Sequence, residues 1–174
     1  MIRESGKIRC LHPHSYLLMF LFLFFALPME TQSVEPIKLL LDFEDTDKSG
    51  RWMVVNDDVM GGVSRSNVKL HSDGHLLFDG EVSTNYGGGF ASVRTDYKNW
   101  EIEKYEGFIL RVKGDGKTYQ FRCRLGNNIN QIAYRHYFQA DNEDWQEILL
   151  PFKEFLPTYR GRVLTNIPQL DPKE

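Results

Sequence analysis

Short runs of alternating apolar and polar residues, separated by turn residues, are the feature that most constrains this chain. Nine such runs follow one another: 38–43, 52–55, 67–70, 75–83, 89–95, 107–113, 118–125, 131–138 and 145–150. A period of two residues is typical of strands with one buried face, and no long stretch has the period of an amphipathic helix. The pattern predicts an all-β protein, an antiparallel β-sandwich or jelly roll.

The alternation also predicts which side chains face the core. Phe108 and Val112 share one face of their run, and Phe121 and Cys123 share one face of the next. Residues 114–116, Gly-Asp-Gly, lie between these two runs, and glycine tolerates the positive φ of a tight turn. We therefore expect the two runs to pair as a β-hairpin. We also expect Cys123 to be a buried structural cysteine, because free cysteine is among the most buried residue types.

The first 33 residues have a different character. An uncharged apolar run covers residues 17–27, and it follows a basic segment that ends near Arg9. This is the layout of a secretory signal, and 11 residues are fewer than the roughly 20 that cross a bilayer. We expect a signal peptide or an uncleaved membrane anchor over residues 1–33 and one sandwich domain over residues 34–174. The protein would then be exported (periplasmic, extracellular or membrane-anchored), with a mitochondrial location as the weaker expectation.

Charge excludes one class of partner. The chain has 21 Lys and Arg residues against 24 Asp and Glu residues, a formal net charge of −3, and a pI near 6.0. Binding to nucleic acid requires a concentrated basic surface, so we expect no nucleic-acid partner. Membrane contact is expected only through the N-terminal segment, if that segment is not cleaved.

No set of residues has the spacing of catalytic machinery. His71 and His75 lie in or beside a turn and His136 lies on an apolar strand face, so no pair of metal ligands such as H-x-x-x-H on a helix is available. No serine lies in a G-x-S-x-G segment, which would mark a nucleophile elbow. The sequence therefore predicts a protein that is not an enzyme and that uses no cofactor.

One acidic segment raises the question of a cation. Asp45 and Asp47 have the spacing that opens a calcium-binding loop, but the twelfth position of that loop is Asn56 instead of glutamate. A single structural cation held by some of Glu44, Asp45, Asp47 and Asp57 remains an alternative to a plain acidic turn. The sequence does not decide between the two.

Several segments resemble a known family. They are residues 52–64 (WMVVNDDVMGGVS), 78–83 (FDGEVS), 88–94 (GGFASVR) and 145–152 (WQEILLPF). In sequence and order they resemble the complex I intermediate-associated protein 30 family. The resemblance implies a galactose-binding-like β-sandwich and a non-enzymatic assembly factor that attends intermediates of NADH:ubiquinone oxidoreductase. The family pattern includes a further strand or two at the C-terminal end, so either the chain is truncated or the sandwich lacks its final strand.

The resemblance and the aromatic residues supply candidate binding positions. The positions expected to define the family surface are Asn56, Asp57, Gly61, Gly62, Ser64, Gly88, Gly89, Phe90 and Arg94. Clusters of Gly, Asn and Asp are first of all turn formers, so the alternative is that these residues shape a turn and a glycine loop and contact no ligand. Tyr86, Trp100 and Tyr137 are expected to be exposed aromatic contacts.

Two functions follow from these candidates. The first is a non-enzymatic assembly or chaperone-like factor that binds a protein partner, such as a membrane complex. The alternative is an exported module that binds a carbohydrate, such as a glycan, or another small ligand.

Overall fold

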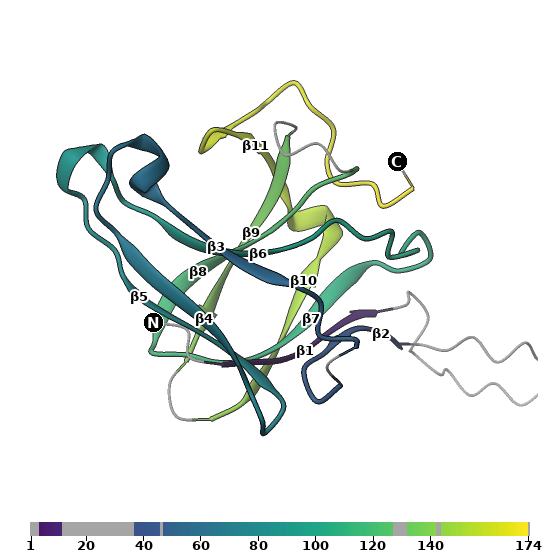
Figure 1. Ribbon diagram of the computed structural model, residues 1–174. Coiled ribbons are helices and arrows are strands. Elements are labelled where there is room, and N and C mark those ends of the chain that lie inside the picture. Colours follow the sequence, from purple (N-terminus) through teal and green to yellow (C-terminus); the bar gives the residue numbers. More distant parts are fainter. Residues whose placement is uncertain (1–3, 12–36, 46, 127–131, 142–143, 174) are drawn as a thin grey trace, which may run out of the picture.

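The computed structural model describes residues 4–11, 37–45, 47–126, 132–141 and 144–173. These residues form antiparallel β-sheets, as Figure 1 shows, and so the predicted all-β sandwich is confirmed. Helical structure in this part of the chain is limited to three short 3-10 turns: η1 (Asp57–Met60), η2 (Asn85–Gly87) and η3 (Phe152–Glu154).

The larger sheet contains six strands. Five of them follow the order β10 (Gln146–Pro151), β7 (Gly107–Lys113), β1 (Glu4–Leu11), β5 (His75–Glu81) and β4 (Arg65–His71). The sixth, β2 (Ile37–Asp42), pairs with β1 along residues 7–11, while β5 meets β1 only at Ser5. One side of β1 is therefore shared by two strands.

The smaller sheet has the order β12 (Arg162–Val163), β11 (Leu156–Tyr159), β9 (Ala133–Ala140) and β8 (Lys117–Cys123). A separate two-stranded ribbon consists of β3 (Trp52–Asn56) and β6 (Ala91–Thr95).

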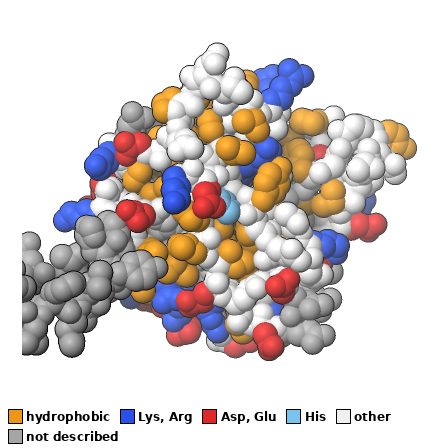
Figure 2. All heavy atoms as spheres, turned by 180° about the vertical axis from the view of Figure 1, so that it is seen from behind, with side chains coloured by type: hydrophobic (Ala, Val, Ile, Leu, Met, Phe, Trp, Pro, Cys, Tyr) orange, Lys and Arg blue, Asp and Glu red, His pale blue; other side chains and the backbone are white. Residues whose placement is uncertain are grey.

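Seen from the side opposite to Figure 1, the surface carries acidic and basic side chains scattered among apolar patches (Figure 2).

Strand β1 lies within the segment that was expected to be a leader. It pairs with β7 from Glu4 opposite Lys113 to Leu11 opposite Gly107. Its Cys10 side chain is 0% exposed, and burial raises the pKa of that thiol to about 12. Part of the expected leader thus completes the core, while the apolar run 17–27 lies outside the described residues. A processing boundary near residue 33 stays a prediction.

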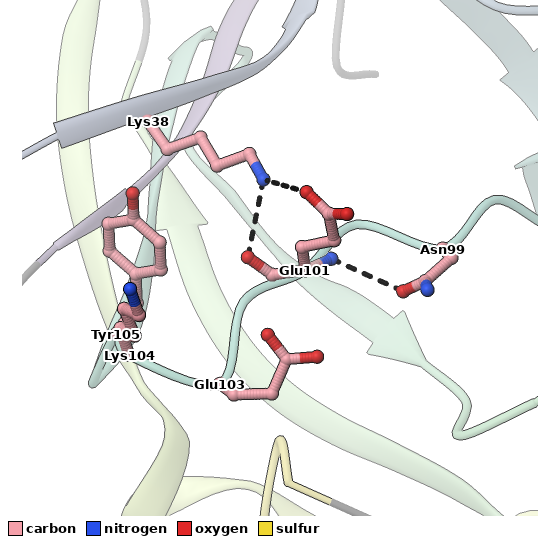
Figure 3. Close-up of a pocket in the computed structure, with 6 residues that line it drawn as sticks. All are labelled: Lys38, Asn99, Glu101, Glu103, Lys104 and Tyr105. Carbon is pink, nitrogen blue, oxygen red and sulfur yellow. Dashed lines mark hydrogen bonds and ion pairs between the residues drawn. The ribbon is translucent and has the colours of Figure 1, made fainter.

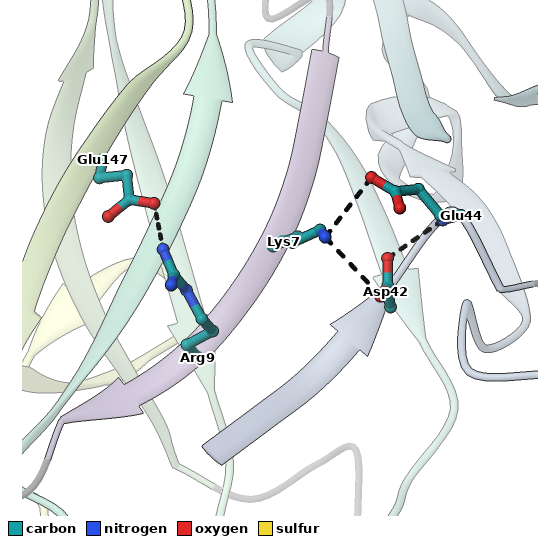
Figure 4. Close-up of polar contacts among 5 residues, drawn as sticks. All are labelled: Lys7, Arg9, Asp42, Glu44 and Glu147. Atoms are coloured by element: carbon teal, nitrogen blue, oxygen red, sulfur yellow. Dashed lines mark hydrogen bonds and ion pairs between the residues drawn. The ribbon is translucent and has the colours of Figure 1, made fainter. Parts of the chain in front are cut away.

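The basic residues that suggested a signal peptide form ion pairs across this sheet. Lys7 Nζ lies 3.4 Å from a carboxylate oxygen of Glu44 and 3.9 Å from one of Asp42, at the end of β2. Arg9 pairs with Glu147 of β10 on the other side (Figure 4). Their positive charges therefore support pairing between strands.

The core between the sheets is rich in phenylalanine. The ring of Phe108 lies 5.1 Å from that of Phe121 and 4.9 Å from that of Phe152, measured between centroids. Phe108 and Val112 are buried on one face, as the alternation predicts. Burying each such side chain contributes about 1.5–3 kcal/mol. Cys123 packs against this core, and burial raises the pKa of its thiol to about 12.

The hairpin expected at residues 114–116 is wrong. Strand β7 pairs with β1 and β10, whereas β8 pairs with β9 in the other sheet, so the turn carries the chain from one sheet to the other. Both edges of β7 are already occupied by strands that are distant in sequence. The turn is held instead by Ala140, whose carbonyl accepts a hydrogen bond from Gly116 N at 2.8 Å.

Within the described ranges, no helix has the length and apolar character needed to cross a membrane.

Candidate functional site

A buried carboxylate joins the two loops that contain most of the candidate residues. Asp57 begins η1 directly after β3, and its side chain is 0% exposed. Its Oδ1 accepts a hydrogen bond from Ser64 N at 2.9 Å. Its Oδ2 accepts three, from Ser64 Oγ at 2.5 Å, Gly89 N at 2.7 Å and Phe90 N at 3.3 Å. We call this arrangement the Asp57 clamp.

These donors favour the ionised form of the carboxyl group. They lower the pKa of Asp57 from 3.8 to about 2. The hydroxyl of Ser64 is the largest cause, burial acts in the opposite direction, and the backbone N–H groups of Gly89, Ser64 and Phe90 add to the lowering. Asp57 is therefore an internal anion whose oxygens are already engaged.

Two glycines make the close approach of these loops to the carboxylate possible. A Cβ atom at Gly62 would lie 2.4 Å from Asp57 Oδ1, and one at Gly88 would lie 2.5 Å from Asp57 Oδ2. Gly61 ends η1 in the left-handed region, with φ of 88°. The glycines of both segments thus serve backbone geometry around one side chain.

Ser64 extends the clamp to a third segment. Its Oγ accepts a hydrogen bond from Ser83 N at 2.9 Å, just beyond the end of β5. On the side of the β3–β6 ribbon, Ser66 Oγ donates to Asn56 Oδ1 at 2.6 Å. The segments around residues 57, 64, 83 and 89 are therefore fixed relative to one another.

The clamp holds a group of apolar side chains in solvent. They lie on the two joined loops, and their exposed fractions are 70% for Val59, 66% for Met60, 46% for Val63, 54% for Val82 and 80% for Tyr86. In Figure 1 the coils η1 (blue) and η2 (teal) lie at the same end of the molecule. Grouped apolar exposure is typical of an interaction site. We call this group the apolar tip.

The structure separates the residues that the sequence grouped. Asn56, Asp57, Gly61, Gly62, Ser64, Gly88, Gly89 and Phe90 come together at or beside the Asp57 clamp. Arg94 instead lies on β6, where its neighbours are other arginines. Asp57 and Ser64 are buried, so they support a surface from beneath.

The three aromatic candidates lie on separate elements. Tyr86 belongs to the apolar tip, and Tyr137 is 47% exposed on β9, where the guanidinium carbon of Arg135 lies 4.8 Å from the ring centroid. Trp100 is half-buried and packs against the core in the segment before β7. No sugar-binding platform built from all three aromatics follows from these positions.

An open pocket of about 520 Å³ lies beside Trp100, between β2 and the segment before β7. Figure 3 shows its lining residues: Lys38, Asn99, Glu101, Glu103, Lys104 and Tyr105. Lys38 Nζ donates to the backbone oxygens of Trp100 at 2.8 Å and Glu101 at 3.2 Å. Its charge is therefore engaged within the protein.

The acidic residues considered for a cation are not gathered in one place. Asp45 pairs with Lys48 at 2.9 Å and accepts a hydrogen bond from Asp47 N at 3.0 Å. Glu44 pairs with Lys7, and Asp57 belongs to the clamp. Their charges are thus used in separate local contacts.

A different group of described residues has an arrangement that could hold a cation. His71 and His75 close the β4–β5 hairpin opposite each other, and Asp73 lies in its turn. One ligand atom of each residue lies within 4.8 Å of the others, and Asp73 Oδ1 is 3.0 Å from His75 Nδ1. This group was not predicted from the sequence because His71 and His75 lie in or beside a turn and the ligand pattern considered was one on a helix. Pairing across a hairpin was the signal that could have found it.

The fold and this site define a β-sandwich protein whose joined loops present a group of exposed apolar side chains. The chain belongs to the Complex I intermediate-associated protein 30 (CIA30) family, whose model matches residues 41–174. The family predicted from the sequence is confirmed.

Two relatives illustrate the similarity. The chain is 33% identical over 138 residues to an uncharacterized protein of Schizosaccharomyces pombe (C9E9.15), covering 69% of this chain and 63% of that protein. It is 22% identical over 156 residues to mouse "Complex I intermediate-associated protein 30, mitochondrial", covering 78% of this chain and 48% of that protein. The chain thus spans less than two thirds of the length of either relative.

The expectation of an exported protein is wrong. The mouse relative bears the designation mitochondrial, and nothing in the comparisons points to export. The apolar run was interpreted by its resemblance to a secretory signal alone, and a run of that kind does not by itself identify a compartment.

Proposed function

We propose that this protein is a non-enzymatic assembly factor of the mitochondrion that binds a protein partner belonging to complex I or to one of its intermediates. The family match over residues 41–174 carries this proposal, together with the name of the mouse relative. Because the chain spans only part of its relatives, the proposal concerns the binding function of this β-sandwich.

The apolar tip is the surface that we assign to the partner. Methionine and tyrosine are enriched at the centres of protein interfaces, and the tip offers Met60 and Tyr86 at 66% and 80% exposure. The Asp57 clamp holds both loops in place before binding. A preorganised surface loses less conformational entropy on association, so the clamp favours tight binding without contacting the partner.

Co-purification of the full chain from mitochondria tests this function. We expect the wild-type protein to recover complex I subunits after cross-linking, as identified by mass spectrometry. Val59→Asp should reduce this recovery about tenfold, because a desolvated charge at the centre of an interface is costly. The thermal unfolding midpoint should not change, since Val59 is 70% exposed.

Val163→Asp is the matched control. Val163 is 43% exposed on β12, outside the apolar tip, so its substitution should leave the recovery unchanged. Equal losses in both variants would contradict the role of the tip. Recovery of no complex I subunit by the wild-type protein would contradict the proposed function itself.

A further inference from the structure

Four arginines gather on and beside the outer face of the smaller sheet. Arg122 of β8 lies directly opposite Arg135 of β9. Arg124 follows two residues after Arg122, and the two-residue period of a strand places it toward the same face. Arg94 of the β3–β6 ribbon is close enough for Arg122 and Arg124 to lower its pKa. We call these four residues the arginine face.

Across the described part of the chain, none of these four arginines forms an ion pair with an acidic residue. Among the described residues, Arg122 donates to the amide oxygen of Gln120 alone, at 3.0 and 2.5 Å. The Nε atoms of Arg124 and Arg135 are buried and find no hydrogen-bond partner in the described ranges. This face therefore lacks anions among its described neighbours.

Neighbouring like charges lower the pKa of two of these arginines, Arg94 and Arg122. Burial, followed by the charges of Arg124 and Arg122, lowers the pKa of Arg94. Burial, followed by Arg135 and Arg124, lowers the pKa of Arg122. Guanidinium groups nevertheless stay charged at neutral pH, so the repulsion persists in the free protein.

Several other cations among the described residues form ion pairs. Arg9 and Arg51 each pair with a carboxylate of another segment, and Lys48 pairs with Asp45 within one turn. Half-buried charges without a counter-ion are costly, and an arrangement that keeps several of them together is suited to an external anion. The charge of the arginine face is therefore complementary to that of an anionic ligand.

We propose that the arginine face binds the phosphate group of a ligand. A phosphate monoester carries about −1.5 to −2 charges at neutral pH and offers three acceptor oxygens, which suits several guanidinium groups better than one carboxylate does. The planar guanidinium fork matches phosphate oxygens in a bidentate manner. This site goes beyond the proposed partner surface, because the apolar tip contains none of these residues.

Binding of pyrophosphate to the full chain tests this site. Isothermal titration should show saturable binding by the wild-type protein, and Arg122→Gln with Arg135→Gln should weaken it at least about tenfold, since hydrogen bonds between charged groups are strong. Arg65→Gln, an exposed arginine of β4, is the matched control and should leave the affinity unchanged. A loss of equal size in the control would overturn the proposal.

A second arm distinguishes the source of the phosphate. Flotation with phosphatidylcholine vesicles, with and without phosphatidic acid, tests a lipid headgroup. Binding that requires phosphatidic acid and fails in the double variant supports the site and assigns it to lipid. Pyrophosphate binding alone supports the site and assigns it to a small phosphate ligand. Binding of neither probe, or equal binding by wild type and double variant, overturns the proposal, whatever the outcome of the complex I co-purification.

Discussion

The Asp57 clamp and the arginine face hold charge in opposite ways. Asp57 is completely buried, yet its two oxygens accept four hydrogen bonds from the protein. Of the four arginines, Arg122 is exposed and the other three are partly buried. Arg94 and Arg122 lie close enough to other arginines for those charges to lower their pKa. The charge of Asp57 is thus balanced by hydrogen bonds from the protein, whereas the charges of the arginine face have no acidic partner among the described residues.

This difference indicates which of the two regions is better suited to bind a ligand. A carboxylate whose oxygens are occupied by backbone donors stabilises the fold and has little capacity left for a ligand. Cations that repel one another gain from a bound anion. The Asp57 clamp is thus mainly architectural, and it fixes the loops that carry the exposed apolar side chains.

Replacing Asp57 by alanine should have the largest effect. The change leaves the N–H groups of Ser64, Gly89 and Phe90 without their acceptor, the first in a buried and the other two in a partly buried position. We expect the thermal unfolding midpoint, measured by circular dichroism, to fall by about 5–10 °C. Asp58→Ala, at the exposed neighbouring carboxylate, should change it by less than about 2 °C. Similar midpoints for the two variants would show that the clamp does not stabilise the fold.

The lowered pKa of Asp57 predicts that the folded protein loses stability in acid. The pKa of Asp57 in the folded protein is about 2, below the 3.8 of the free group, so its contribution is complete above pH 4. It is lost as the pH falls from about 4 through about 2. The difference in unfolding midpoint between wild type and Asp57→Asn should therefore shrink across this interval. A difference that stays constant down to pH 2 would refute the assignment.

Most of the fold could be predicted because a strand with one buried face alternates locally. The nine expected strands are all present, with shifted ends. Strand β1 was missed because residues 4–11 precede an apolar run, and local pattern favoured a signal peptide there. The hairpin at residues 114–116 was wrong because pairing of β7 is decided by distant strands, β1 and β10, which no local turn reports.

The candidate site could be predicted only in part. The glycines and Asp57 were grouped because their segments resemble a family, but the burial of Asp57 could not be read from residue type, since aspartate is usually exposed. The arginine face depends on the register that places Arg122 opposite Arg135. Alternation within single strands does not determine the register between strands, so the common location of these positive charges could not be predicted.

The smallest predicted effect concerns the arginine face. Removing one charge from the arginine face relieves repulsion without breaking an ion pair, so Arg122→Gln should raise the unfolding midpoint at low salt by about 1–3 °C. Arg51→Gln breaks the 2.9 Å contact with Asp96 and should give no increase. Added salt should reduce the gain of Arg122→Gln, because screening weakens the repulsion that the variant removes. A lower midpoint for Arg122→Gln would mean that this arginine stabilises the free protein, and the contrast with Asp57 would then be lost.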